Sequence, residues 1–337
     1  MSFAAALEDA GEHRHALLGN GFSIACRNDI FTYGSLLERA DFRDVPYAPQ
    51  LFEALGTTDF EVVIQTLVQA SRAAAVYPGT DPALIHRLAH DADRLKTILV
   101  NAIARNHPDL PNEIDDEEYR CCRAFLSNFK HIYTLNYDLL LYWALMHNEE
   151  GEWIECDDGF RNPIDEFGTD YVSWEEHHSS NIHYLHGALH LFDAGHQLRK
   201  YTWSRTNVPL MTQIRQALDS DMYPLFVAEG TSKAKLNKIN HSAYLHKALR
   251  SFEGTCRTRN AAFFIFGHSL AENDEHILRL IERGSFPKLY VSLFGDPALP
   301  GNQAIMRRAR KMADRRHEKR PLSVNFFDAA SACVWRA

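Results

Sequence analysis

Short apolar segments recur along the chain, and most are followed by turn-forming residues and then by a segment with helical periodicity. Such runs, rich in β-branched and aromatic residues, are typical of strands buried on both faces. The helical segments between them supply the crossovers that parallel strands require. The pattern therefore predicts an α/β protein with a doubly wound, mostly parallel sheet. The expected strands are residues 15–18, 131–135, 181–185, 224–229, 261–267, 288–295 and 322–328.

Two regions depart from this alternation of strands and helices. Residues 40–128 carry only helical patterns, punctuated by prolines, which indicates a helical insertion. Residues 148–180 are acidic, aromatic and rich in turn formers, and they are too long for an ordinary connection. We therefore expect a single Rossmann-like domain over residues 1–337, with the insertion at 40–128 and an active-site flap at 148–180. Both are expected to cover a cleft or an oligomer interface and so to restrain activity.

The charge balance argues against a nucleic-acid or membrane partner. The 337 residues carry 36 Lys and Arg against 44 Asp and Glu, a formal net charge of −8. No overall positive field therefore attracts polyanions, and the basic stretch 307–320 is typical of a solvated helix face. No segment approaches the roughly 18 apolar residues of a membrane-spanning helix, and the acidic start lacks a signal-peptide pattern. We expect a cytoplasmic protein.

The six cysteines suggest neither a metal site nor a disulfide framework. They are scattered along the chain, and no C-x-x-C pair occurs among them. Because a zinc ribbon needs closely spaced pairs, no structural metal is expected from them. Isolated cysteines of this kind are usually small buried apolar residues.

Two glycine-containing loops follow apolar strands and are candidates for nucleotide contact. Glycine lets backbone N–H groups approach a phosphate without a Cβ atom in the way. The alternative for the first loop is an ordinary strand-to-helix turn, because the full G-x-G-x-x-G pattern is absent. The acidic residues after the second loop have a structural explanation, since they favour the positive N-terminus of a helix. The candidate residues are Gly19, Asn20, Gly21, Phe22 and Ser23 in LLGNGFS, and Gly267, His268 and Ser269 in FIFGHSL.

Polar residues also follow the strand at 131–135, in the segment TLNYD. Asn136 offers both a hydrogen-bond donor and an acceptor, and Asp138 precedes an apolar helical segment. In open α/β sheets the carboxyl ends of the strands form the ligand crevice. The alternative is that Asn136 and Asp138 only cap the helix that follows. The sequence leaves both interpretations open.

The segment NIHYLHGALH places His186 at the end of an expected strand, beside Gly187. An imidazole in this position can act as a general base near neutral pH, although a merely packed histidine is the alternative. The neighbouring His183 and His190 also suggest a metal site. On a strand, however, residues 183 and 186 point to opposite faces, so we expect no metal there. Further along, Lys233 either neutralises a phosphate or is solvated in the first turn of a helix.

The order of these motifs resembles that of the sirtuin superfamily. Sirtuins carry a Gly-Ala-Gly-x-Ser loop, a Thr-Gln-Asn-Ile-Asp segment, a His-Gly pair and a Gly-x-Ser segment, and GNGFS, TLNYD, YLHG and GHSL match them in order. Nearly the whole chain is also similar to a bacterial sirtuin-like group filed as a domain of unknown function. The resemblance implies that NAD is bound as substrate. It places Gly19, Asn20, Gly21 and Ser23 at the phosphates, and Gly267 and Ser269 at the adenosine. It also places Asp138 at the nicotinamide amide and makes Asn136 and His186 the catalytic residues at the nicotinamide ribose.

Departures from the sirtuin pattern narrow the activity that the resemblance implies. The four-cysteine zinc ribbon and the Gly-Ile-Pro-Asp-Phe-Arg segment are absent, and Leu135 stands where sirtuins have glutamine. NAD-dependent protein deacylation is therefore less supported than NAD+ hydrolysis to nicotinamide and ADP-ribose, an activity of sirtuin-like domains in bacterial antiphage defence. The alternative is a non-catalytic NAD or nucleotide sensor, or a structural subunit. The expected partners are the nucleotide and either a second copy of the chain or a defence-system protein.

Overall fold

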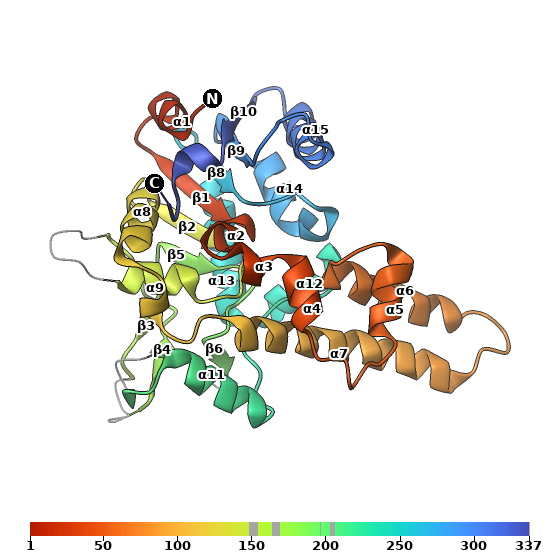
Figure 1. Cartoon of the computed structure of the whole chain (residues 1–337). Helices are drawn as coiled ribbons and strands as arrows, with labels where there is room; N and C mark the ends of the chain where they lie inside the picture. Colours follow the sequence, from red (N-terminus) through yellow and green to blue (C-terminus); the bar gives the residue numbers. More distant parts are fainter. Residues whose placement is uncertain (148–153, 164–168, 196, 203–205, 337) are drawn as a thin grey trace.

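A six-stranded parallel sheet forms the centre of the molecule, and helices cover both of its faces (Figure 1). The predicted doubly wound α/β class is therefore confirmed. The computed structural model describes residues 1–147, 154–163, 169–195, 197–202 and 206–336. The strands of this sheet are β1 (Arg14–Leu18), β2 (His131–Thr134), β5 (Ile182–Tyr184), β8 (Ala262–Phe266), β9 (Lys288–Leu293) and β10 (Ser323–Asp328).

The order of the strands reverses once, between β1 and β8. Across the sheet the strands lie as β10-β9-β8-β1-β2-β5, and every neighbouring pair is parallel. The chain thus builds outward from β1 to β5 and then returns to the other side of β1. This is the arrangement of dinucleotide-binding sheets, in which ligands lie beyond the carboxyl ends of the strands at the reversal.

Alternate residues of β8 pack against opposite helical layers. The ring of Phe264 lies 5.9 Å from that of Phe3 in α1 (Phe3–Ala10), on one face of the sheet. The ring of Phe263 lies 5.4 Å from that of Phe252 in α13 (Ala243–Cys256), on the other face. Because both faces are buried, the strand reads as a continuous apolar run rather than as an alternating one.

The expected strand at 224–229 is wrong. The structure contains only an isolated antiparallel bridge between Phe226 and Gly187 there, and the segment does not join the parallel sheet. Its backbone instead bonds to the chain after β5: the Val227 N–H donates to the His186 carbonyl at 2.9 Å. The segment is apolar because Leu225, Phe226 and Val227 are buried, and burial alone does not identify a sheet partner.

Only helices occur between residues 40 and 128. The antiparallel pair α6 and α7 extends away from the sheet as an arm (Figure 1). Helix α8 differs, because its Phe125 packs 5.2 Å from Phe266 of the central sheet. The last helix of the predicted insertion therefore belongs to the layers that cover the sheet. The helices of this region are α5 (Ala48–Leu55), α6 (Phe60–Ala74), α7 (Pro82–Asn106), η1 (Pro111–Glu113) and α8 (Asp116–Leu126).

The predicted flap at 148–180 lies partly outside the described residues, at 148–153 and 164–168. Its described part contributes two strands to a second, antiparallel sheet with the order β3-β4-β7-β6. These strands are two to four residues long, too short for an alternating pattern to predict them. They are β3 (Phe160–Arg161), β4 (Tyr171–Trp174), β6 (Leu191–Asp193) and β7 (Leu198–Tyr201).

The remaining helices lie between successive strands of the main sheet, except η3, which follows β10. In the described part of the chain, none is both long and apolar enough to cross a membrane. They are α2 (Gly21–Cys26), α3 (Asn28–Phe31), α4 (Tyr33–Arg39), α9 (Leu140–Met146), α11 (Leu210–Asp219), α12 (Ser232–His241), η2 (Glu272–Asp274), α14 (Glu275–Arg283), α15 (Pro300–Asp314) and η3 (Ala330–Ala332).

Buried His107 makes the fold sensitive to acid. Its Nε2 accepts the Leu139 N–H at 3.1 Å and its Nδ1 contacts the Pro108 carbonyl at 2.9 Å, so protonation of Nε2 breaks the first bond. Burial lowers the pKa of His107 to about 4. Between about pH 6.5 and 4 the unfolded chain therefore binds a proton that the folded chain does not, and stability falls as the pH falls.

We expect His107→Gln to reduce this acid sensitivity. The free energy of unfolding of the wild type should fall with pH more steeply than that of the variant, by about 1.4 kcal/mol per pH unit near pH 5. Urea denaturation at several pH values measures the difference. Parallel curves for the two proteins would contradict the assignment.

Candidate functional site

A cavity of about 1000 Å³ opens at the carboxyl ends of β1, β2, β8 and β9, where the strand order reverses. The helical arm contributes Phe60 of α6 and Leu99 and Ile103 of α7 to its wall, whereas no described residue of 148–180 lies there. Most of the expected site residues line it: Gly19, Asn20, Gly21, Asn136, Asp138, His186, Gly267, His268 and Ser269.

Phe22 and Ser23, which the sequence also assigned to the site, lie behind the cavity wall. Phe22 is buried and its ring packs 5.2 Å from that of Trp335, whose Nε1–H donates to the Phe22 carbonyl at 2.9 Å. Trp335 itself lines the cavity. Ser23 is fully buried and binds Asn136 and Asp138 from behind. These two residues therefore hold the groups that face the cavity.

The three glycines of the two loops pack against one another. The Gly21 N–H donates to the Gly267 carbonyl at 2.8 Å, and a Cβ atom on Gly21 would meet the Gly267 Cα at 2.5 Å. A Cβ on Gly19 would meet the Gly267 oxygen at 2.7 Å, and Gly267 has a φ of +69°. Close contact between the loops of β1 and β8 thus explains why these residues are glycines. The sequence had instead suggested that they leave space for a phosphate.

Asn136 is held by hydrogen bonds that do not cap the following helix. Its Nδ2 donates to the Gly19 carbonyl at 3.0 Å and to the Ser23 hydroxyl at 2.9 Å. Both amide hydrogens are therefore engaged, and Oδ1 remains to accept a hydrogen bond from the cavity. The capping interpretation fails for Asn136.

Asp138 does cap the helix, and it also belongs to the site. Its Oδ1 accepts the Leu140 N–H at 2.9 Å, at the start of α9. Its Oδ2 accepts the Ser23 hydroxyl, which links it to Asn136. Burial raises the pKa of Asp138 above its ordinary value. Asp138 thus combines the two roles that the sequence treated as alternatives.

His186 faces the cavity, and the neighbouring histidines do not converge with it. His183 lies against Ser251, with 3.0 Å between its Nε2 and the serine Oγ, and His190 packs 4.8 Å from the ring of Tyr142. The Nε2 of His186 instead lies 3.1 Å from the Nε2 of His276. Burial lowers the pKa of His186 well below 6.5, so the ring is neutral at pH 7.

Three charged residues that the sequence did not assign to the site form a buried cluster beside His186. The Nζ of Lys235 lies 2.7 Å from the Glu61 Oε2 and 2.8 Å from the Asp274 Oδ1. The Lys235 side chain is 1% exposed. By contrast Lys233, which the sequence considered for a phosphate, is exposed. The cluster joins the helical arm to the α12–η2 region of the main domain.

The cluster holds two carboxylates against one ammonium. Burial raises the pKa of Glu61 to about 7. Although burial opposes ionisation of Asp274 too, Lys235 and a hydrogen bond from His268 lower the pKa of Asp274 well below its ordinary value. Burial likewise disfavours the Lys235 ammonium, but the two acids raise the pKa of Lys235. Asp274 is thus the ionised partner, and Glu61 takes up a proton first as the pH falls.

His268 is committed to the protein rather than to a ligand. Its Nδ1 accepts the Leu270 N–H at 2.9 Å, so its Nε2 carries the proton and donates to the Asp274 Oδ2 at 3.0 Å. Leu270 has a φ of +56°, a backbone conformation that costs about 1–3 kcal/mol in a non-glycine residue. Next to it, Ser269 is exposed at the cavity and is the group of this loop that can contact a ligand.

One family model matches the chain over residues 16–335, from the first strand to the tryptophan at the cavity wall. The chain belongs to the DUF4917 family, described as a domain of unknown function. A search of curated proteins finds no match. The match to DUF4917 spans the central sheet and the cavity-lining residues up to Trp335.

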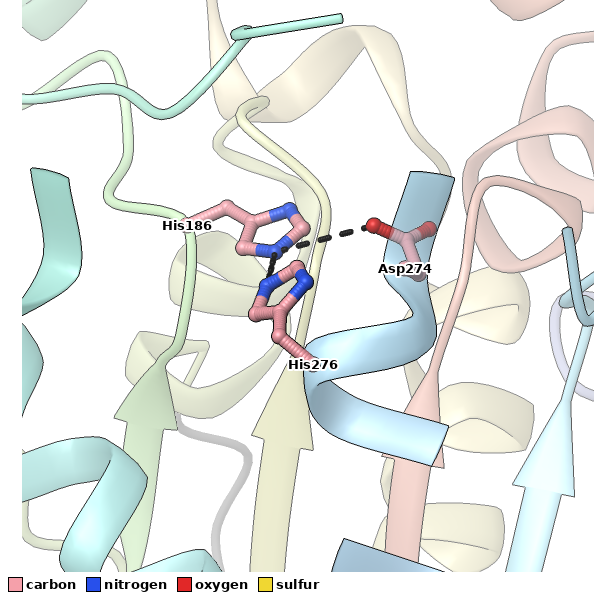
Figure 2. Close-up of side chains that lie close together, drawn as sticks. All are labelled: His186, Asp274 and His276. Carbon is pink, nitrogen blue, oxygen red and sulfur yellow. Dashed lines mark hydrogen bonds and ion pairs between the residues drawn. The ribbon is translucent and has the colours of Figure 1, made fainter. Parts of the chain in front are cut away.

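Besides a nucleotide, a metal ion is a second candidate ligand for the cavity of this DUF4917 protein. His186, Asp274 and His276 place one ligand atom each within 4.8 Å of one another (Figure 2), a donor set typical of divalent transition metals. The Lys235 ammonium, however, already lies 2.8 Å from the Asp274 oxygen. A fixed positive charge at this distance opposes a divalent cation. The geometry therefore favours hydrogen bonding between the two histidines over metal binding.

Proposed function

We propose that this DUF4917 protein hydrolyses NAD+ at the bond between nicotinamide and its ribose. The observation that carries the proposal is the position of Asn136 and His186 together on the wall of a large cavity at the reversal of the strand order. Dinucleotides bind across this crevice in sheets of the same order. The resemblance of TLNYD and YLHG to sirtuin motifs assigns the same two residues to the nicotinamide ribose.

The proposed reaction needs a positioned water and a proton acceptor. The oxygen of water forms a bond to C1′ of the ribose while the C1′–N bond breaks, and its electron pair remains on the nicotinamide nitrogen. The products are neutral nicotinamide, ADP-ribose and one proton. The transition state has oxocarbenium character, so a base that takes the water proton and groups that orient the water accelerate the reaction.

The chain supplies both functions at the β2–β5 side of the cavity. The Oδ1 of Asn136 is oriented by two hydrogen bonds from Nδ2, and it accepts a hydrogen bond from the water or a ribose hydroxyl. The neutral imidazole of His186 takes the proton. Asp138, which also lines the cavity, would bind the nicotinamide amide. Exposed Ser269 and Phe294 line the part of the cavity near β8 and β9, where the adenosine is expected.

Release of nicotinamide and ADP-ribose from NAD+ by the purified protein tests the proposal. We expect equal amounts of both products, measured by liquid chromatography, with or without an acetylated lysine peptide. Release that requires the peptide would support deacylation. Binding of NAD+ without cleavage would support a nucleotide sensor, and neither binding nor cleavage would overturn the proposal.

Constant hydrolysis would deplete the NAD of the cell that makes the protein. We therefore extend the proposal to antiphage defence, in which activity is restrained until a defence-system protein or self-association releases it. The helical arm lines the cavity and extends away from the sheet, so it is the element placed to transmit such a signal (Figure 1). Activity that appears only above a threshold protein concentration would support control by self-association.

A further inference from the structure

His276 lies in the first turn of helix α14, and its ring lies next to that of His186 (Figure 2). The two Nε2 atoms are 3.1 Å apart, and the ring planes differ by only 19°. The same Nε2 of His186 lies 3.8 Å from the Asp274 Oδ1. Both contacts thus involve one nitrogen of His186, and the other, Nδ1, lies on the far side of the ring (Figure 2). His276 itself does not line the cavity.

The contact between the rings restricts where their protons lie. A hydrogen bond between two imidazole nitrogens needs one N–H and one lone pair, so one Nε2 is protonated and the other is not. Burial lowers the pKa of both rings, to about 4 for His276, which keeps both neutral at pH 7. The Asp274 carboxylate lies beside the His186 Nε2 and favours a proton there.

The remaining partner of His276 is compatible with this arrangement. Its Nδ1 lies 3.3 Å from the hydroxyl oxygen of Ser232, the first residue of α12. With a proton on Nδ1, His276 donates to Ser232 and offers the Nε2 lone pair to His186. A chain of hydrogen bonds then runs from His186 through His276 to Ser232, and it leaves the His186 Nδ1 without a proton.

We propose that His276 is a positioning residue that fixes the Nε2–H tautomer of His186 and so presents Nδ1 as the proton acceptor. This inference rests on the proposed hydrolysis for its chemical role. When Nδ1 takes the proton of the attacking water, the ring becomes an imidazolium 3.8 Å from the Asp274 carboxylate. Asp274 favours that charge, whereas the Lys235 ammonium, 2.8 Å from the same Asp274 oxygen, opposes it, so the imidazolium readily passes its proton on.

Two substitutions of His276 separate positioning from packing. The amide of glutamine reaches the place of Nε2 and can still accept from His186, whereas asparagine reaches only the place of Nδ1, toward Ser232. We expect His276→Asn to lower kcat for nicotinamide release by about 10²-fold with KM for NAD+ unchanged, and His276→Gln to retain most turnover. A merely structural role predicts similar losses for both. Equal losses, no loss in either, or a change confined to KM would overturn the proposal.

The tautomer itself is measurable without turnover. Long-range ¹H–¹⁵N NMR of histidine-labelled wild type, with His186→Gln to assign the signal, should show the proton of His186 on Nε2. A proton on Nδ1 would overturn the inference, as would stoichiometric divalent metal bound to both rings. If the Nε2–H tautomer is found and His276→Asn abolishes it, positioning is supported even where no nicotinamide is released. In that case the proposed hydrolysis fails and the positioning of His186 does not.

Discussion

Replacement of Lys235 by methionine is expected to lower the free energy of unfolding by about 3–5 kcal/mol. Lys235 is the ammonium between Glu61 and Asp274, at 2.7 and 2.8 Å, and its side chain is 1% exposed. Methionine keeps the apolar stem but leaves two buried carboxylates without a counter-charge. Because an uncompensated buried charge costs much more than the pair contributes, the loss exceeds that of an ordinary surface substitution. Urea denaturation at pH 7 measures it.

Matched variants distinguish loss of the charge from loss of packing. Lys233→Met alters an exposed lysine in the same helix and should change stability by no more than about 0.5 kcal/mol. Adding Glu61→Gln to Lys235→Met removes one of the two buried acids that have lost their counter-charge. It should therefore restore part of the lost stability. The loss should also grow as the pH rises above 7, because Lys235 lowers the pKa of Glu61 and its removal leaves Glu61 protonated where the wild type ionises it. A Lys235→Met protein as stable as the wild type at pH 7 would contradict a stabilising role of the Lys235 ammonium.

The central sheet was predictable because parallel strands buried on both faces read as apolar runs. Phe263 and Phe264 face opposite helical layers, so no alternation was needed to find β8. The same rule failed at 224–229, where Phe226 is also buried but pairs with the chain after β5. An apolar run therefore indicates that a segment is buried. Whether the segment pairs with a strand of the sheet depends on tertiary structure, which the run does not show. The short strands of the second sheet were missed for a related reason, since two to four residues carry too little pattern.

The site was predictable only where it lies on strand ends. Asn136 and His186 follow strands whose carboxyl ends share one edge, so the sequence brings them together without knowledge of packing. Lys235 and His276 lie on helices, and their place depends on how those helices pack. The position of Asp274 at the start of a helix already explained an acidic residue there. The sequence therefore gave no reason to expect its contacts with Lys235 and His268. The one available signal was the spacing of Lys233 and Lys235. Two residues apart in a helix, they lie on different sides of α12, so one of them could face the protein while the other faced solvent.

Asn136→Ala and His186→Ala are expected to lower the rate of NAD+ cleavage by about 10²–10⁴-fold each, if the wild type hydrolyses NAD+ as proposed. In the proposed reaction His186 supplies the proton acceptor, and Asn136 supplies the carbonyl oxygen that orients the water or the ribose. Asn136→Ala also removes hydrogen bonds to Gly19 and Ser23, so it should cost about 1–3 kcal/mol of stability while the protein stays folded. Circular dichroism and urea denaturation establish the folded fraction before kcat is compared.

His183→Ala is the matched control for His186→Ala. Both histidines are buried and belong to the same strand segment, but His183 contacts Ser251 and does not line the cavity. Its loss should lower the melting temperature and leave kcat near that of the wild type. If His186 were merely packed, the two variants would behave alike: stability would fall first, and the rate only with the folded fraction. If Asn136 were needed only for structure, its variant would retain turnover in proportion to folded protein. Binding of NAD+ that persists in both site variants, with cleavage lost, places their contribution in the transition state rather than in substrate affinity.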